Sequence, residues 1–148
     1  MTEILFFELL IYCVIVNIPI LCGVKVRIKE ENGIKTILSI GANIGEIEKN
    51  FIKATKTLRR AGLEKLKVSS PYKNKALGCS KGTPDFTNAA ISGIWHGAVD
   101  ELHELCKRIE ITCGRPEHHP KWASRTLDID IIFFGNLIFK SERLHIPH

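Results

Sequence analysis

The sequence lacks the loop motifs with which many proteins hold nucleotides. Neither G-x-x-x-x-G-K-[ST] nor a G-x-G-x-x-G that opens a helix occurs in its 148 residues, and the segment GANIG at residues 41–45 matches neither pattern. A P-loop NTPase and a Rossmann dinucleotide-binding domain are therefore excluded. Internal repeats and low-complexity segments are absent as well, which leaves an ordinary globular chain.

Paired cysteine motifs are also missing. The chain has five cysteines, an odd number, and none of them forms a C-x-x-C pair. Most of them fall within apolar runs, so we expect buried reduced thiols rather than disulfides or a zinc site. Cysteines used in this way are typical of a cytoplasmic protein.

Aromatic residues make up only 7% of the chain, but 45% of it is hydrophobic and 25% charged. This balance predicts one globular domain and excludes two full domains, a disordered chain and a collagen-like fibre. The net charge is +5, and every lysine and arginine lies after residue 24. A basic domain indicates an anionic partner, either a nucleic acid or a phosphorylated small molecule, and charge alone does not choose between them.

The N-terminus is unusually apolar. Residues 4–24 contain 17 apolar residues out of 21, enough to span a bilayer, although Glu8, Asn17 and Pro19 interrupt the run. No lysine or arginine precedes it, as a secretory signal would require. Three interpretations stay open: a membrane anchor with the domain on the cytoplasmic side, an extension that packs on the domain or on a second copy, and a start-site extension without function. A polar linker divides the chain into an extension, 1–33, and a domain, 34–148.

Hydrophobic periodicity predicts the element order strand, helix, strand, strand, helix, strand in the domain. The expected strands cover residues 35–40, 63–72, 85–95 and 126–134, the helices begin near residues 47 and 99, and a short hairpin follows at 137–146. This order predicts an α+β ferredoxin-like sandwich, a four-stranded antiparallel sheet with both helices on one face. The apolar run IIFF at residues 131–134 predicts a central place for the last long strand.

Two acidic residues, Asp128 and Asp130, open that last strand. Residues i and i+2 of a strand point to the same side, so both carboxylates should face one way. Two adjacent like charges are unfavourable unless bases or a hard cation neutralise them, and Mg²⁺ favours one or two carboxylates together with substrate phosphates. An exposed pair without a function remains the alternative.

Basic residues cluster just before this pair. The cluster comprises Arg115, His118, His119, Lys121 and Arg125. Arginine forks match phosphate oxygens, and with metal ions they stabilise the charge of phosphoryl transfer. The sequence therefore favours a polyphosphate with a metal at this site.

Three more residues are candidates for substrate contacts. Trp122, in the same polar loop, is either a surface aromatic or part of a lid over the site. Phe86 and Asn88 begin the third strand, where a ring could stack on a flat ligand and an amide could bind its edge. A core phenylalanine and a turn asparagine explain these two residues equally well.

Several segments resemble one enzyme family. The matching pieces are LSIGANIGE, SSPYKNKALG, PDFTNAA, RIE followed three residues later by GR, W-x-x-RTLDIDIIFFGN and ERLHIPH. Across residues 36–148 the sequence resembles the 6-hydroxymethyl-7,8-dihydropterin pyrophosphokinases, and the R-T-L-D-I-D core is its most specific part. The resemblance implies a ferredoxin-like fold and transfer of pyrophosphate from ATP to the pterin hydroxymethyl group, giving AMP and the pterin diphosphate in folate biosynthesis.

The resemblance also implies roles for individual residues. Two Mg²⁺ ions would bind Asp128 and Asp130 and bridge the phosphates of ATP, while Arg115 and Arg125 would hold those phosphates. The remaining implied roles are Trp122 in the catalytic loop, Phe86 stacked on the pterin, Asn88, Asn74 and Leu77 at the pterin edge, Glu110 supporting the site, and His148 on ATP.

Two other functions stay open at this stage. One is a shortened, non-catalytic relative that binds ATP or a pterin, because the chain stops at His148, where family members continue. The other is a basic RNA-binding ferredoxin-like domain. This chain lacks the aromatic pattern that such a domain carries on its third strand. We expect small-molecule substrates and no nucleic acid, and leave membrane association through residues 4–24 and self-association open.

Overall fold

The computed structural model describes residues 33–76, 82–116 and 123–148. Within them no helix is long and apolar enough to cross a membrane. The apolar extension lies outside the described residues except for Gly33, so its three interpretations, like the cytoplasmic location, stay predictions. The elements are β1 (Ile34–Ala42), α2 (Ile47–Arg60), β2 (Glu64–Val68), β3 (Tyr72–Asn74), β4 (Phe86–Trp95), α3 (Val99–Thr112), β5 (Asp128–Phe134), β6 (Phe139–Lys140) and β7 (His145–Ile146).

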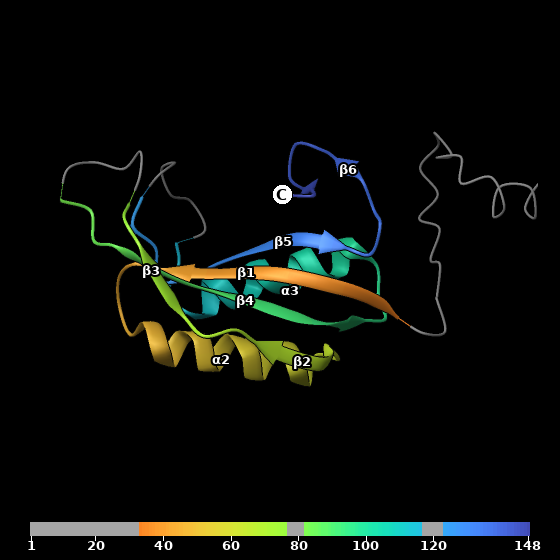
Figure 1. Cartoon of the computed structure of the whole chain (residues 1–148), viewed down its shortest axis with the longest axis horizontal. Coiled ribbons are helices and arrows are strands. Elements are labelled where there is room, and N and C mark those ends of the chain that lie inside the picture. Colours follow the sequence, from red (N-terminus) through yellow and green to blue (C-terminus); the bar gives the residue numbers. More distant parts are fainter. Residues whose placement is uncertain (1–32, 77–81, 117–122) are drawn as a thin grey trace, which may run out of the picture.

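The main sheet has the order β2-β4-β1-β5, and its neighbouring strands are antiparallel. Helices α2 and α3 both lie on one face of this sheet (Figure 1). The small β6–β7 hairpin sits beyond β5, which β7 contacts. This arrangement confirms the predicted ferredoxin-like sandwich, and it leaves the sheet face opposite the helices without a helical cover in the described part of the chain.

The core lies between the sheet and the helices. Alternate residues of β1, including Leu38 and Ile40, are fully buried in this core. Burial of each such side chain contributes about 1.5–3 kcal/mol to the free energy of folding. The predicted apolar face of α3 is confirmed, since its buried residues include Leu102, Leu105, Cys106 and Ile109. Burial raises the pKa of Cys106 to about 12, so this thiol stays protonated and unreactive.

One predicted strand divides into two. Instead of a single strand over residues 63–72, β2 and β3 are separate, and both pair with β4. The interruption at residues 69–71 contains Pro71, whose nitrogen has no proton to donate to a strand ladder. The predicted second strand is thus replaced by two short strands that share one place beside β4, so the described sheet contains five strands in four positions.

The predicted central place of the last long strand was also wrong. β5 is the edge strand, and β1 and β4 occupy the centre. Its apolar run is accommodated differently, because Ile131 and Phe134 are buried in the core while Phe133 remains 46% exposed. The C-terminal segment covers part of the edge, where the His148 amide donates to the Ile132 carbonyl at 3.2 Å.

Candidate active site

The open face of the sheet brings the predicted acids and the predicted amide into one row. In the strand register Asn88 of β4 lies opposite Gly41 of β1, and Gly41 lies opposite Asp128 of β5. The next row on the same face pairs Ser39 with Asp130. Because only Gly41 stands between them, Asn88 of β4 and Asp128 of β5 face one another across a residue without a side chain. The predicted same-side placement of Asp128 and Asp130 is confirmed by the alternation with buried Ile129.

Asp128 is held by both predicted arginines. Arg115 Nη1 donates to Asp128 Oδ1, and Arg125 Nη1 donates to Asp128 Oδ2. Burial alone would raise the pKa of Asp128, but the two guanidinium charges outweigh it and hold that pKa below its usual range. The carboxylate is therefore ionised, with two cations already oriented around it.

Asp130 has a different environment. Its ion-pair contact in the described chain is His148, whose Nε2 lies 4.0 Å from Asp130 Oδ1. Burial and the neighbouring charge of Asp128 raise the pKa of Asp130 above its usual range. An ionised Asp130 is thus poorly neutralised by the protein, which is the condition under which a bound cation stabilises a carboxylate most.

Glu110, on the last turn of α3, supports this arrangement from below. The residue is 2% exposed, and its carboxylate accepts hydrogen bonds from Arg115 Nη1, Lys107 Nζ and the Ile129 amide, each at 2.8 Å. Burial raises the pKa of Glu110, and the neighbouring cations and the amide act against that rise. Since Arg115 contacts both Glu110 and Asp128, the helix fixes where the arginine meets the strand. The supporting role of Glu110 stays a prediction.

Phe86, Asn74 and Asn88 lie together at the other side of the row. Asn74 of β3 pairs with Phe86, and its Oδ1 accepts a hydrogen bond from Asn88 Nδ2. The Arg125 guanidinium carbon lies 5.6 Å from the centre of the Phe86 ring, within cation–π range. Arg125 therefore touches both the acidic and the aromatic parts of the site.

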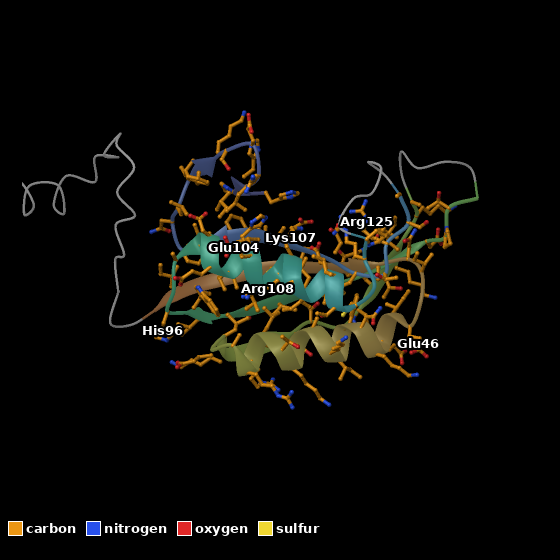
Figure 2. All side chains as sticks on the ribbon, turned by 180° about the vertical axis from the view of Figure 1, so that it is seen from behind. Glu46, His96, Glu104, Lys107, Arg108 and Arg125 are labelled. Atoms are coloured by element: carbon orange, nitrogen blue, oxygen red, sulfur yellow. The ribbon has the colours of Figure 1, made fainter. Side chains whose placement is uncertain are left out.

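A cavity of about 400 Å³ opens beside Asp130, between α3, β5 and the hairpin. Figure 2 shows Lys107 on the hairpin side of α3, with Arg125 beyond the helix end. The polar side chains that line the cavity include His103, Lys107, Asp130, Arg143, His145 and His148. With Glu142, which also lines the cavity, the group holds two acids, two cations and three histidines. The volume is within the usual range of ligand sites.

His103 and Lys107 line this cavity although neither is among the predicted site residues. Burial lowers the pKa of His103. Its spacing to Lys107 and Glu110 is four and then three residues, which puts all three on one helix face. That spacing is the signal that would have found both bases.

Two predicted site residues, Leu77 and Trp122, lie outside the described residues, as do His118, His119 and Lys121. In the described ranges, no group of three or more histidine, cysteine, aspartate or glutamate side chains is placed to hold a metal ion. A divalent cation at Asp128 and Asp130 would accordingly draw further oxygen ligands from substrate or water, as Mg²⁺ commonly does.

Gly41 is expected to be required for the position of the Asn88 amide. A Cβ at residue 41 would collide with Asn88 Oδ1, the end of a side chain that can rotate away. The Gly41→Ala variant should therefore fold but bind a ligand held by Asn88 about tenfold more weakly, a loss typical of one to two hydrogen bonds. Calorimetric titration measures this effect. In an Asn88→Ala background the added methyl should make no further difference, and a full tenfold loss there would contradict the explanation.

Comparison with known proteins assigns the chain to a family. The family model for 7,8-dihydro-6-hydroxymethylpterin-pyrophosphokinase matches residues 37–148, the whole ferredoxin-like domain except the start of β1. The chain belongs to this family. The pyrophosphokinase of Haemophilus influenzae is 33% identical over 116 residues, covering 78% of this chain and 71% of that protein. The corresponding protein of Synechocystis is 34% identical over 113 residues, covering 76% of this chain and 56% of that protein.

Other relatives in the family are longer proteins. A folate synthesis bifunctional protein of Arabidopsis thaliana is 32% identical over 114 residues, or 77% of this chain. The match covers only 23% of that protein, and 26% of a bifunctional protein of Chlamydia trachomatis. The chain thus spans about a quarter of the length of these relatives.

Proposed function

We propose that this chain transfers pyrophosphate from ATP to the hydroxymethyl group of 6-hydroxymethyl-7,8-dihydropterin, releasing AMP, as a step of folate biosynthesis. Family membership supports this reaction class. The observation that carries it is that Arg125 contacts both Asp128 and the ring of Phe86. A phosphate-binding group and a surface for a flat ring are thereby joined at one point, as a transfer between a nucleotide and a pterin needs.

The two acids fit Mg²⁺, of which we propose two ions. Carboxylate oxygens are the hard ligands that Mg²⁺ prefers, and Asp128 and Asp130 present them on one face of β5. The weak neutralisation of Asp130 supports the same assignment. When bound, the metal would act as a Lewis acid that stabilises the charge developing on the phosphates. Asp130 would bind it without first giving up an arginine.

The nucleotide is proposed to lie along β5, with its nucleoside in the cavity beside Asp130 and His148. Its phosphates would then point toward Arg115 and Arg125. Both guanidinium groups now donate to Asp128, and phosphate oxygens would replace the carboxylate as their acceptors. The triphosphate thus takes the place of the Asp128 carboxylate, which also carries negative charge. Both arginines therefore keep an anionic partner throughout.

The pterin is proposed to lie on the Phe86 ring, with its polar edge on Asn88 and Asn74. An amide supplies both a donor and an acceptor, which a pterin edge requires, and the Asn74–Asn88 hydrogen bond orients the two amides together. Held there, the substrate hydroxyl faces the phosphates beside Arg125. Most of the acceleration would come from this alignment for in-line attack on the β-phosphorus.

The proposal is tested by product analysis. The purified chain is incubated with ATP, Mg²⁺ and the hydroxymethyl pterin, and mass spectrometry follows AMP and the pterin diphosphate. Equal amounts of both products, dependent on the pterin, are expected. Formation of ADP would exclude pyrophosphate transfer, and calorimetric binding of ATP and pterin without any product would favour the non-catalytic relative instead.

A further inference from the structure

Asn43, in the turn between β1 and α2, forms two hydrogen bonds with the backbone of Arg125. Its side-chain Oδ1 accepts a hydrogen bond from the Arg125 backbone amide at 2.7 Å, and its backbone amide donates to the Arg125 carbonyl at 3.1 Å. The residue is only 4% exposed. A buried amide is costly unless its polar atoms are bonded, so these bonds fix one arrangement of the two segments.

The side-chain nitrogen of Asn43 binds a second segment. Asn43 Nδ2 donates to the Pro84 carbonyl at 3.3 Å and to Ser124 Oγ at 3.2 Å. Pro84 stands two residues before Phe86, which begins β4. The partners also fix the orientation of the amide, because the Arg125 N–H requires an acceptor and the Pro84 carbonyl requires a donor. One side chain therefore links the segment carrying Phe86 to the one carrying Arg125.

We propose that Asn43 is a positioning residue that sets the Arg125 guanidinium between Asp128 and the Phe86 ring. This inference rests on the proposed pyrophosphate transfer for its kinetic consequence. The guanidinium reaches Asp128 Oδ2 on one side and lies 5.6 Å from the Phe86 centroid on the other. Misplacement by about 1 Å can cost a transfer reaction about a hundredfold in rate. Asn43 acts on the reaction only through Arg125.

Substitution of Asn43 separates positioning from stability. In Asn43→Ala all three side-chain bonds are lost, and kcat should fall about a hundredfold. Asn43→Asp keeps an acceptor for the Arg125 amide but sets a carboxylate oxygen against the Pro84 carbonyl. This variant is used for the kcat measurement if Asn43→Ala does not fold. Thr36→Val is the matched control, because Thr36 is fully buried and its Oγ1 donates to the Phe133 carbonyl at 2.9 Å, outside the site. Its kcat should stay within about twofold of wild type, since distant sites act independently.

A double substitution tests whether Asn43 works through Arg125. In an Arg125→Ala background, Asn43→Ala should lower kcat by no more than about threefold, because the group that it positions is gone. A further hundredfold loss in that background would overturn the proposal. So would a Thr36→Val variant that loses as much activity as Asn43→Ala.

Amide hydrogen exchange gives a readout that does not need turnover. The Arg125 amide should be protected in wild type and in Thr36→Val, and should lose at least about tenfold in protection in Asn43→Ala, where its acceptor is removed. Unchanged protection of Arg125 would overturn the positioning role whatever the activity. If the wild-type chain forms no AMP, the proposed function fails, while the exchange result still decides whether Asn43 holds Arg125.

Discussion

Replacing Asp130 with alanine is expected to lower kcat/KM for pyrophosphate transfer by about a thousandfold, the upper range for loss of one group that stabilises transition-state charge. Asp130 faces the proposed nucleotide cavity, and burial and the charge of Asp128 raise its pKa. Glu48→Gln is the matched control, because Glu48 is an exposed carboxylate on α2 that does not line this cavity. Its rate should remain within about twofold of wild type. Equal losses in both variants would show only a general effect of charge.

A substitution at Asp130 should lower activity but raise the stability of the fold. The folded pKa of Asp130 is raised, so the acid contributes most stability below its unfolded pKa of about 3.9 and loses it as pH rises through the folded value. At pH 7 without divalent cations, Asp130→Asn should therefore raise the free energy of unfolding, by at most about 1 kcal/mol because the side chain is partly exposed. Urea unfolding measures this. The gain should vanish below about pH 3.9, and a less stable variant at pH 7 would contradict the assignment.

The second large effect is expected from Arg115→Ala, which should cost about 3 kcal/mol of folding free energy. Arg115 is 9% exposed, and its loss leaves Glu110, 3% exposed at the side chain, and Asp128 with one cation fewer each. Removing one partner of a buried ion pair is costly because the remaining charge is poorly solvated. Urea unfolding at pH 7 measures the loss. Arg108→Ala, on the exposed side of α3, is the control and should change stability by less than about 0.5 kcal/mol.

The cost of Arg115→Ala should also depend on pH. The folded pKa of Asp128 is lowered, so its ion pairs stabilise the fold above the unfolded pKa and that stability is lost as pH falls through the folded value. The difference between wild type and Arg115→Ala should therefore shrink below about pH 3.9. A difference that stayed constant down to acid unfolding would mean that Arg115 contributes by packing rather than by charge.

Local patterns were sufficient to predict much of the fold. The helices follow from apolar spacing, and Asp128 and Asp130 share a face because side chains alternate along any strand. The place of β5 at the sheet edge was not predictable from its apolar run, because the cover comes from the C-terminal segment, which meets it only after folding. Pro71 was the local signal for the split between β2 and β3, and it was outweighed by the surrounding alternation.

The site was predictable only in its residue types. The chemistry of Asp128, Arg115 and Arg125 was apparent from the sequence, but the convergence of both arginines on one carboxylate depends on where the loops return to the sheet. Asn43 appeared to be an ordinary turn residue. Its partners lie 41 and 81 or 82 positions away, so no local pattern could reveal them.

Binding of Mn²⁺, followed by electron paramagnetic resonance in the presence of a non-hydrolysable ATP analogue, tests the central claim most directly. The claim is that the adjacent acids of β5 collect divalent cations around a triphosphate. Wild type should bind Mn²⁺ together with the analogue, and Asp130→Asn should weaken that binding by at least about tenfold while Glu48→Gln does not, as expected when a metal loses one carboxylate ligand. Equal Mn²⁺ binding by wild type and Asp130→Asn would contradict the account.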